Sequence, residues 1–194
     1  MKQFVTTLFV AVFTLVLGQN AQAQDFPKVD KSVLDVAYYP ARAAFRNFEK
    51  TPEAKAANEP IMRVIYSRPL KNGRKVFGEL EKFGTVWRVG ANEATEIQFF
   101  KPVRLNGTAI QAGRYTLYAE LAEKEWTVHV STDLDGWGAY SFKPEASTVA
   151  KITVPTAATK SVVEACSILF EKAEDGAHLI IAWDDTMVRV PFQF

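Results

Sequence analysis

The side chains with the most chemical potential gather between Tyr66 and Phe99, a stretch that also contains four glycines. Its three arginines, near predicted turns, can converge on a carboxylate, sulfate or phosphate, because guanidinium groups bind planar oxyanions through paired hydrogen bonds. Asparagine and glutamate side chains can fix hydroxyl groups, and tryptophans can supply a stacking wall. The predicted ligand is a saccharide or a small anion, and the candidate residues are Arg68, Arg74, Trp87, Arg88, Asn92, Glu93 and Trp137.

The same residues also fit other interpretations. The arginines can pair with acidic neighbours in a network that only pins loops, the candidate partners being Glu79, Glu93 and Glu96. Trp87 can simply face the core. Alternatively, the protein is a hydrolase in which Glu93 or Glu96 acts as the base beside Arg88, which requires a cleft that raises the pKa of that carboxyl. A third alternative is a structural or assembly protein of the cell envelope.

Most catalytic and cofactor templates are absent from the sequence. It has no His-Glu-x-x-His helix, Gly-x-Ser-x-Gly elbow, phosphate loop or Gly-x-Gly-x-x-Gly motif. His129 and His178 lie on different predicted strands, so we expect no histidine-based metal site. Asp133 and Asp135 resemble the start of a calcium loop, but its closing acidic ligand would fall at Phe142, so we interpret both as turn residues. We therefore expect neither a cofactor nor a metal.

The composition is that of an ordinary globular domain, with 48% hydrophobic and 23% charged residues. A net charge of +1 over 194 residues gives no basic stripe, so we expect no nucleic-acid partner. Cys166 is the one cysteine, which excludes an internal disulfide, and its place within a predicted strand is typical of a buried, inert thiol.

The first residues have the pattern of an export signal. Lys2 precedes an apolar run from Phe4 to Leu17 that is too short for a comfortable transmembrane span, and a small-x-small cleavage site ends at Ala23. We predict cleavage after Ala23, a periplasmic or secreted protein, and no membrane span after cleavage. The predicted organisation is a signal peptide (1–23), an N-terminal extension (24–60) and a β-sandwich domain (61–194). The oligomeric state is left open.

From residue 61 onward, short apolar–polar alternations are separated by turn residues. Asn106-Gly107 is the strongest hairpin signal, and Pro155 is expected to end a strand. Residues 51–60 indicate a mobile surface loop. The pattern predicts an all-β fold, an antiparallel β-sandwich that is jelly-roll-like. The predicted strands cover 61–67, 86–89, 94–101, 103–105, 108–110, 114–121, 125–131, 149–154, 162–172, 178–184 and 187–194.

Several long motifs follow one another between Val33 and Phe194. They are LDVAYYP, YSRP–NGR–VFGEL, VWRVGANEATEI, AGRYTLYA, EWTVHVS, WGAYSF and IIAWDDTMVRVPF. In this order they resemble the exported bacterial family called domain of unknown function 2911 (DUF2911), common in Bacteroidetes. The chain departs from the family at Glu81–Gly84, where a proline-aromatic-glycine turn is more usual. The resemblance implies an exported all-β domain without an established activity, and it marks the same seven candidate residues.

Overall fold

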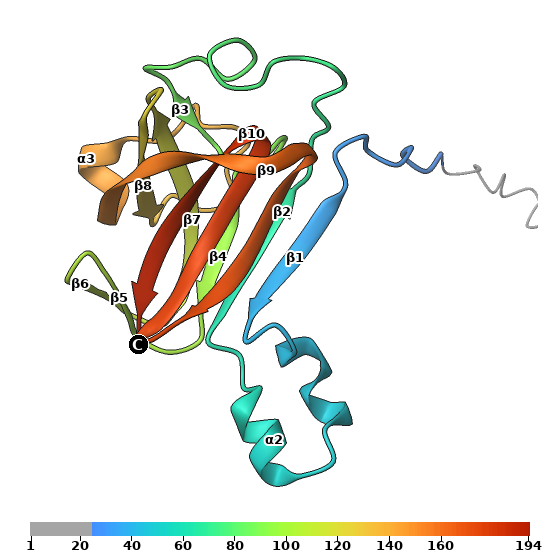
Figure 1. Ribbon diagram of the computed structural model, residues 1–194, viewed down its shortest axis with the longest axis vertical. Helices are drawn as coiled ribbons and strands as arrows, with labels where there is room; N and C mark the ends of the chain where they lie inside the picture. Colours follow the sequence, from blue (N-terminus) through green and yellow to red (C-terminus); the bar gives the residue numbers. More distant parts are fainter. Residues whose placement is uncertain (1–24) are drawn as a thin grey trace, which may run out of the picture.

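The computed structural model describes residues 25–194, which form a β-rich body with a small helical projection (Figure 1). The strands are β1 (Leu34–Tyr39), β2 (Met62–Ser67), β3 (Val86–Trp87), β4 (Glu96–Phe99), β5 (Val103–Leu105), β6 (Thr108–Ile110), β7 (Gly113–Leu121), β8 (Glu125–Ser131), β9 (Thr148–Ala173) and β10 (Gly176–Gln193). The helices are η1 (Ala43–Phe48), α2 (Pro52–Ala57) and α3 (Pro144–Ser147). The predicted signal peptide and its cleavage site lie outside the described residues.

The strands form one long antiparallel sheet that folds back over itself. Its order is β1-β2-β4-β7-β8-β9-β10-β5-β6, with β3 beside β7. Because β9 pairs first with β8 and then with β10, the two ends of the sheet become facing layers. Across the core, the Tyr66 hydroxyl donates to the Ile168 carbonyl at 3.3 Å, and the rings of Phe99 and Phe192 lie 5.4 Å apart. The predicted all-β antiparallel sandwich is confirmed.

An aromatic cluster fills the core where β3, β8 and β10 meet. Trp87 stacks on Trp183 with ring centroids 6.2 Å apart and planes at 18°, and Phe77 lies 4.7 Å from Trp126. Trp87 is only 1% exposed, which corrects the expectation that it offers a stacking wall to a ligand. The physical reason is strand register, because Trp87 pairs with the buried Ala119 and both side chains point inward.

The two C-terminal strands are longer than the sequence predicts. β9 continues past Pro155, and β10 joins the two predicted strands 178–184 and 187–194. Pro155 pairs with Glu125 at the end of the β8 ladder, and Thr156 already pairs with β10. The proline therefore lies where one ladder gives way to the next, a position at which its missing N–H is tolerated.

Asp184 forms an irregularity in the middle of β10. The register against β9 shifts on both of its sides, and its φ is 57°. Its buried carboxylate accepts hydrogen bonds from Lys71 Nζ (2.5 Å) and from the Val76 N–H (3.1 Å). Burial acts to raise the pKa of this carboxyl, but the hydrogen bonds from Lys71 and Val76 outweigh it and hold the pKa below its ordinary value. Asp184 is thus an internal anchor within β10 and not the end of the strand predicted over 178–184.

The predicted N-terminal extension contributes a strand to the sheet. β1 pairs with β2 along its whole length, from Leu34 opposite Ser67 to Tyr39 opposite Met62. The side chains of Leu34 and Ser67 therefore share a position at one end of the sheet. This places the beginning of the described chain beside the loops that follow β3 and β8.

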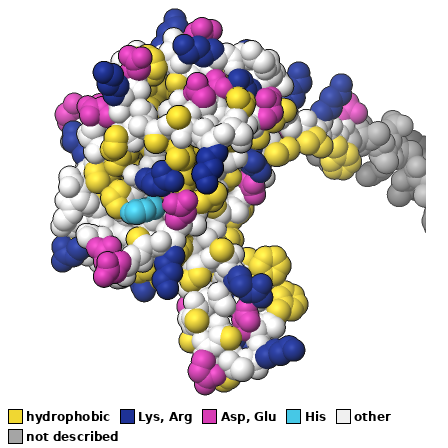
Figure 2. Space-filling view, in the orientation of Figure 1, with side chains coloured by type: hydrophobic (Ala, Val, Ile, Leu, Met, Phe, Trp, Pro, Cys, Tyr) yellow, Lys and Arg dark blue, Asp and Glu magenta, His cyan; other side chains and the backbone are white. Residues whose placement is uncertain are grey.

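The segment between β1 and β2 projects from the sandwich as η1 and α2 (Figure 1). Thr51 caps α2 by accepting the Ala54 N–H at 3.2 Å, and proline occupies the first turn, so the predicted mobile loop is wrong here. Figure 2 shows hydrophobic side chains on this projection, and acidic and basic side chains interspersed over the rest of the visible face. No helix within residues 25–194 is long and apolar enough to cross a membrane.

Candidate functional site

Residues 88–95 connect β3 to β4 and form a loop that we name the Glu93 loop. The buried Trp87 indole N–H donates to the Gly90 carbonyl at 3.2 Å, and the Thr95 hydroxyl donates to the Val89 carbonyl at 2.8 Å. Val89 has a φ of 60°, which β-branched residues rarely adopt. The two hydrogen bonds hold this strained backbone in place. Trp87 therefore positions the Glu93 loop from below.

Residues 132–143 follow β8 and form a second loop, which we name the Trp137 loop. Its anchor is Asp133, whose carboxylate accepts the hydroxyls of Tyr118 (3.1 Å) and Ser141 (3.0 Å). Phe142 stacks on the Tyr118 ring with centroids 4.1 Å apart. Burial and the negative charge of Asp133 raise the pKa of Tyr118, so its hydroxyl stays protonated and remains a donor. The Trp137 loop is thereby fixed onto the outer face of β7.

Backbone hydrogen bonds join the two loops. The Ala94 N–H donates to the Gly136 carbonyl at 3.0 Å, and the Asn92 carbonyl accepts an N–H of the Trp137 loop at 2.9 Å. Glu93 and Trp137 face each other as an antiparallel bridge. The structure therefore brings together three of the seven predicted site residues, Asn92, Glu93 and Trp137.

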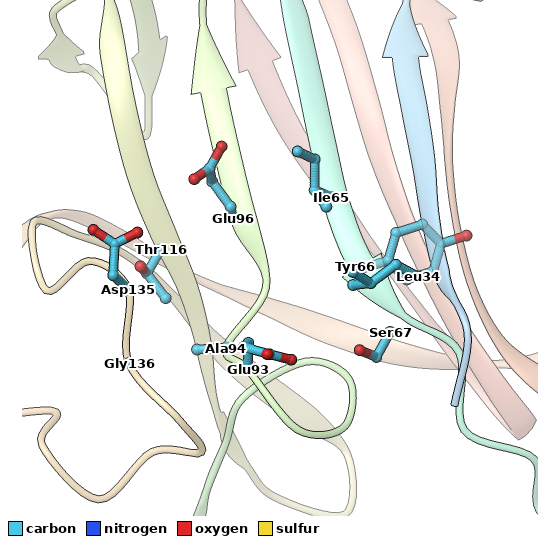
Figure 3. A pocket seen from close by; sticks show the side chains of 10 residues that line it. All are labelled: Leu34, Ile65, Tyr66, Ser67, Glu93, Ala94, Glu96, Thr116, Asp135 and Gly136. Carbon is cyan, nitrogen blue, oxygen red and sulfur yellow. The ribbon is translucent and has the colours of Figure 1, made fainter. Parts of the chain in front are cut away.

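A cleft opens on the outer face of the sheet, between the two loops, β1 and the residues that lead into β1. It consists of two hollows of about 320 and about 380 Å³ that share Leu34, Ser67 and Glu93. Both volumes lie within the range of about 300–1,000 Å³ that is typical of small-molecule sites. The Glu96 hollow (Figure 3) is also lined by Ile65, Tyr66, Ala94, Glu96, Thr116, Asp135 and Gly136. The Trp137 hollow is also lined by Val29, Asp30, Ser32, Val33, Asn92 and Trp137. We name the two together the outer cleft.

The charged side chains that line the outer cleft are all acidic, namely Asp30, Glu93, Glu96 and Asp135. Arg114 lies next to the Glu96 hollow and donates to Glu96 and to Asp135, each at 2.7 Å. These hydrogen bonds and charges hold the pKa of Arg114 above its ordinary range. Four carboxylates stand against two guanidinium groups, those of Arg114 and of Arg63, which lies 3.8 Å from Glu96, so the outer cleft carries a net negative charge.

Arg68 is fully engaged in holding the sandwich together. Its guanidinium donates to the Cys166 carbonyl (3.1 Å), to Asp35 (2.9 Å) and to the Ser167 hydroxyl (2.9 Å). It ties the end of β2 to both β1 and β9. The expected ligand contact is therefore corrected in favour of an ion pair, and the acidic partner is Asp35 rather than one of the glutamates expected from the sequence.

The other two arginines also lie away from the outer cleft. Arg74 donates to the carbonyls of Leu70 (2.6 Å) and Lys71 (2.7 Å) within its own turn. Burial raises the pKa of the Glu81 carboxyl, and the positive charge of Arg88 offsets part of this rise. Neither arginine lines either hollow. The expectation that the arginines converge on one anion is therefore corrected.

The two glutamates considered as hydrolytic bases both line the Glu96 hollow. Glu96 accepts a hydrogen bond from Arg114 at 2.7 Å and lies 3.8 Å from Arg63. Glu93 is exposed, and Arg88 is not among the lining residues. A general base needs a free carboxylate held in a protected position. Glu96 is held by Arg114 and Glu93 is exposed, so neither glutamate meets this requirement.

Ser67 and Asp135 line the cleft but were not predicted as site residues. Ser67 occupies the outer face of the strand predicted over 61–67, and it is 1% exposed. The alternation of apolar and polar residues along the strand indicates which face of the sheet Ser67 occupies. It does not mark a site, because small polar residues at strand ends are common. The sequence predicts only a turn at Asp135, because its partner Arg114 is recognisable only in the folded chain.

Within residues 25–194, no group of three or more His, Cys, Asp or Glu side chains is arranged to hold a metal ion. His129 is fully buried, with Nδ1 at 3.0 Å from the Thr148 hydroxyl. Its Nε2 lies 3.1 Å from Glu120 without the geometry of a hydrogen bond. Burial lowers the pKa of His129, and the charge of Glu120 opposes this shift. His129 thus supports the underside of the Trp137 loop, where it contacts Phe142.

Comparison with protein-family models gives a match to the family described as "Protein of unknown function (DUF2911)" over residues 49–192. The matched residues include both loops of the outer cleft, whereas Leu34 and the rest of β1 precede them. No curated protein and no solved structure matches the chain.

Proposed function

The chain belongs to the DUF2911 family of proteins of unknown function, and from the geometry of the outer cleft we propose that it is a non-enzymatic binding module for a saccharide. The observation that carries this proposal is the indole of Trp137, which is 61% exposed although its backbone is bridged to Glu93. The amide of Asn92 and the carboxylate of Glu93 line the same hollow. A sugar ring presents an apolar face for an indole and hydroxyl groups for such polar side chains.

A small anion is the weaker candidate ligand. The predicted arginines are bonded elsewhere or lie outside the hollows, and the lining side chains that carry charge are acidic. Like charges brought together in a partly enclosed site repel, so a sulfate or carboxylate would bind with a penalty. Together with the predicted signal peptide, the proposal describes a saccharide-binding protein of the periplasm or the extracellular space.

The test is calorimetric titration with a panel of neutral oligosaccharides. We expect Trp137→Ala to weaken binding at least tenfold, equivalent to about 1.4 kcal/mol, while the melting temperature stays the same because the indole is exposed. The control is Tyr140→Ala, which removes an aromatic ring of the same loop that is 88% exposed but lines neither hollow. A panel without any binder, or equal affinities for the two variants, would overturn the proposal.

A further inference from the structure

The hydroxyl of Ser67 stands out within the outer cleft. Ser67 is 1% exposed, yet its Oγ has no hydrogen-bond partner within residues 25–194. It lines both hollows, and Figure 3 shows its oxygen directed toward the Glu93 loop, with the Glu93 carboxylate directed back toward it. A buried polar group that lacks a partner is costly unless something supplies one. The position of this hydroxyl, between the two hollows, points to a hydrogen-bonding group on the ligand.

The charged side chains around Ser67 indicate which kind of ligand group would bind beside its hydroxyl. Asp135 and Glu96 are compensated by Arg114, whereas Glu93 and Asp30 form no salt bridge within the described residues. Glu93 therefore contributes an uncompensated negative charge opposite the Ser67 hydroxyl. A carboxylate paired with a hydroxyl oxygen offers acceptors to a donor-rich cation and repels carboxylate, sulfate and phosphate groups.

The cation that fits is an ammonium group rather than a metal ion. The part of the chain that the structure describes holds no cluster of three metal-ligating side chains, so too few protein ligands are present for a metal. An ammonium has three N–H donors and needs acceptors in several directions, which a carboxylate and a hydroxyl can share with water. The indole of Trp137 lines the adjoining hollow, which is available to the sugar ring that carries the ammonium group.

We propose that the outer cleft prefers saccharides with a free amino group, and that it binds this ammonium between the Glu93 carboxylate and the Ser67 hydroxyl. The inference rests on the proposed saccharide-binding function and adds the chemistry that distinguishes one saccharide from another. Amino sugars are bound more tightly than their N-acetylated counterparts, because acetylation removes the charge and leaves the rest of the ring unchanged.

The test compares two probes of equal length, an oligomer of glucosamine and the corresponding oligomer of N-acetylglucosamine. Calorimetric titrations are made at about pH 6, below the pKa of about 7.7–8.0 that is typical of α-amino groups. For the unmodified protein we expect the glucosamine oligomer to bind at least tenfold more tightly, and raised salt concentration to reduce this preference. Glu93→Gln should abolish the preference, because it should weaken binding of the glucosamine oligomer at least tenfold more than binding of the acetylated oligomer. The control Glu125→Gln changes an exposed acid that lines neither hollow, and it should change nothing.

A second variant tests the role of the hydroxyl. Because the Ser67 Oγ has no partner in the described chain, Ser67→Ala should keep or raise the melting temperature and still weaken binding of the glucosamine oligomer severalfold. Equal affinities for the two oligomers would overturn the amino-sugar preference and leave saccharide binding intact. A preference that survives in both Glu93→Gln and Ser67→Ala would also overturn it. The absence of binding to any oligosaccharide would remove the proposed function and this inference together.

Discussion

Arg68→Ala separates a structural arginine from a ligand-binding one. The guanidinium connects three segments, since its partners Asp35, Cys166 and Ser167 lie 33, 98 and 99 residues away in the sequence. The arginine side chain is 33% exposed and that of Asp35 is 42% exposed, so this ion pair alone contributes only about 0.5 kcal/mol. The two hydrogen bonds to β9, which run to the carbonyl of the buried Cys166 and to the Ser167 hydroxyl, contribute about 1 kcal/mol each.

We therefore expect Arg68→Ala to lower the free energy of unfolding by about 2–3 kcal/mol. For a domain of this size, that loss corresponds to a decrease in melting temperature of about 5–10 °C. Urea unfolding followed by tryptophan fluorescence measures it, because Trp87, Trp126 and Trp183 are buried and become exposed to solvent on unfolding. Saccharide affinity should not change at temperatures where the variant is folded.

The matched control is Arg74→Ala. Arg74 makes two hydrogen bonds, but both are to carbonyls of its own exposed turn, so its loss should cost less than about 0.5 kcal/mol. If Arg68→Ala were as stable as Arg74→Ala, the account of Arg68 as a cross-link would be refuted. A loss of ligand affinity without loss of stability would return Arg68 to the list of binding residues.

Three further predictions concern buried titratable groups. Burial raises the pKa of the Cys166 thiol to about 12, so a thiol reagent at pH 8 should label it only as urea unfolds the protein. Burial lowers the pKa of His129, so the folded protein favours the neutral form of this side chain. The resulting stability is complete above the unfolded pKa of about 6.5 and is lost as the pH falls through the folded pKa. His129→Gln should therefore flatten the pH dependence of the urea midpoint in this window. Lys71→Met leaves the Asp184 carboxylate buried and without its cation, and should lower the free energy of unfolding by about 3–5 kcal/mol, with Asp184→Asn in the same chain restoring part of the loss.

Local features of the fold could be predicted from the sequence because they depend on interactions between residues that are close together in the chain. Asn106 and Gly107 both have positive φ, at 50° and 78°, which is the conformation that a two-residue hairpin turn requires. The alternation along β7 and β8 correctly assigns Leu117 and Val128 to the core face and His129 to the opposite, outer face. His129 is nevertheless buried, because the Trp137 loop covers that face, and no alternation pattern reports such a cover.

The hydrogen-bond and ion-pair partners of long charged side chains could not be predicted from the sequence in the same way. The sequence places Arg68 next to a turn, but the fold alone decides that β1 and β9 meet the end of β2 there. Pro155 was a sound local signal for a strand end, and it failed because β9 changes partners at that residue. Both errors arise from contacts between residues far apart in the sequence.

The outer cleft owes its shape to groups that a ligand would not touch. Trp87 and Thr95 hold the strained Val89 backbone, Asp133 fixes the Trp137 loop, and the two loops are joined by backbone hydrogen bonds. A site held in this way needs little ordering when a ligand enters, so more of the contact energy becomes affinity. The same construction makes stability and binding inseparable at Trp87, whose replacement would loosen the core and the Glu93 loop together. Trp137 and Ser67, in contrast, touch the cleft without supporting the fold, and therefore they are the residues at which binding can be tested by itself.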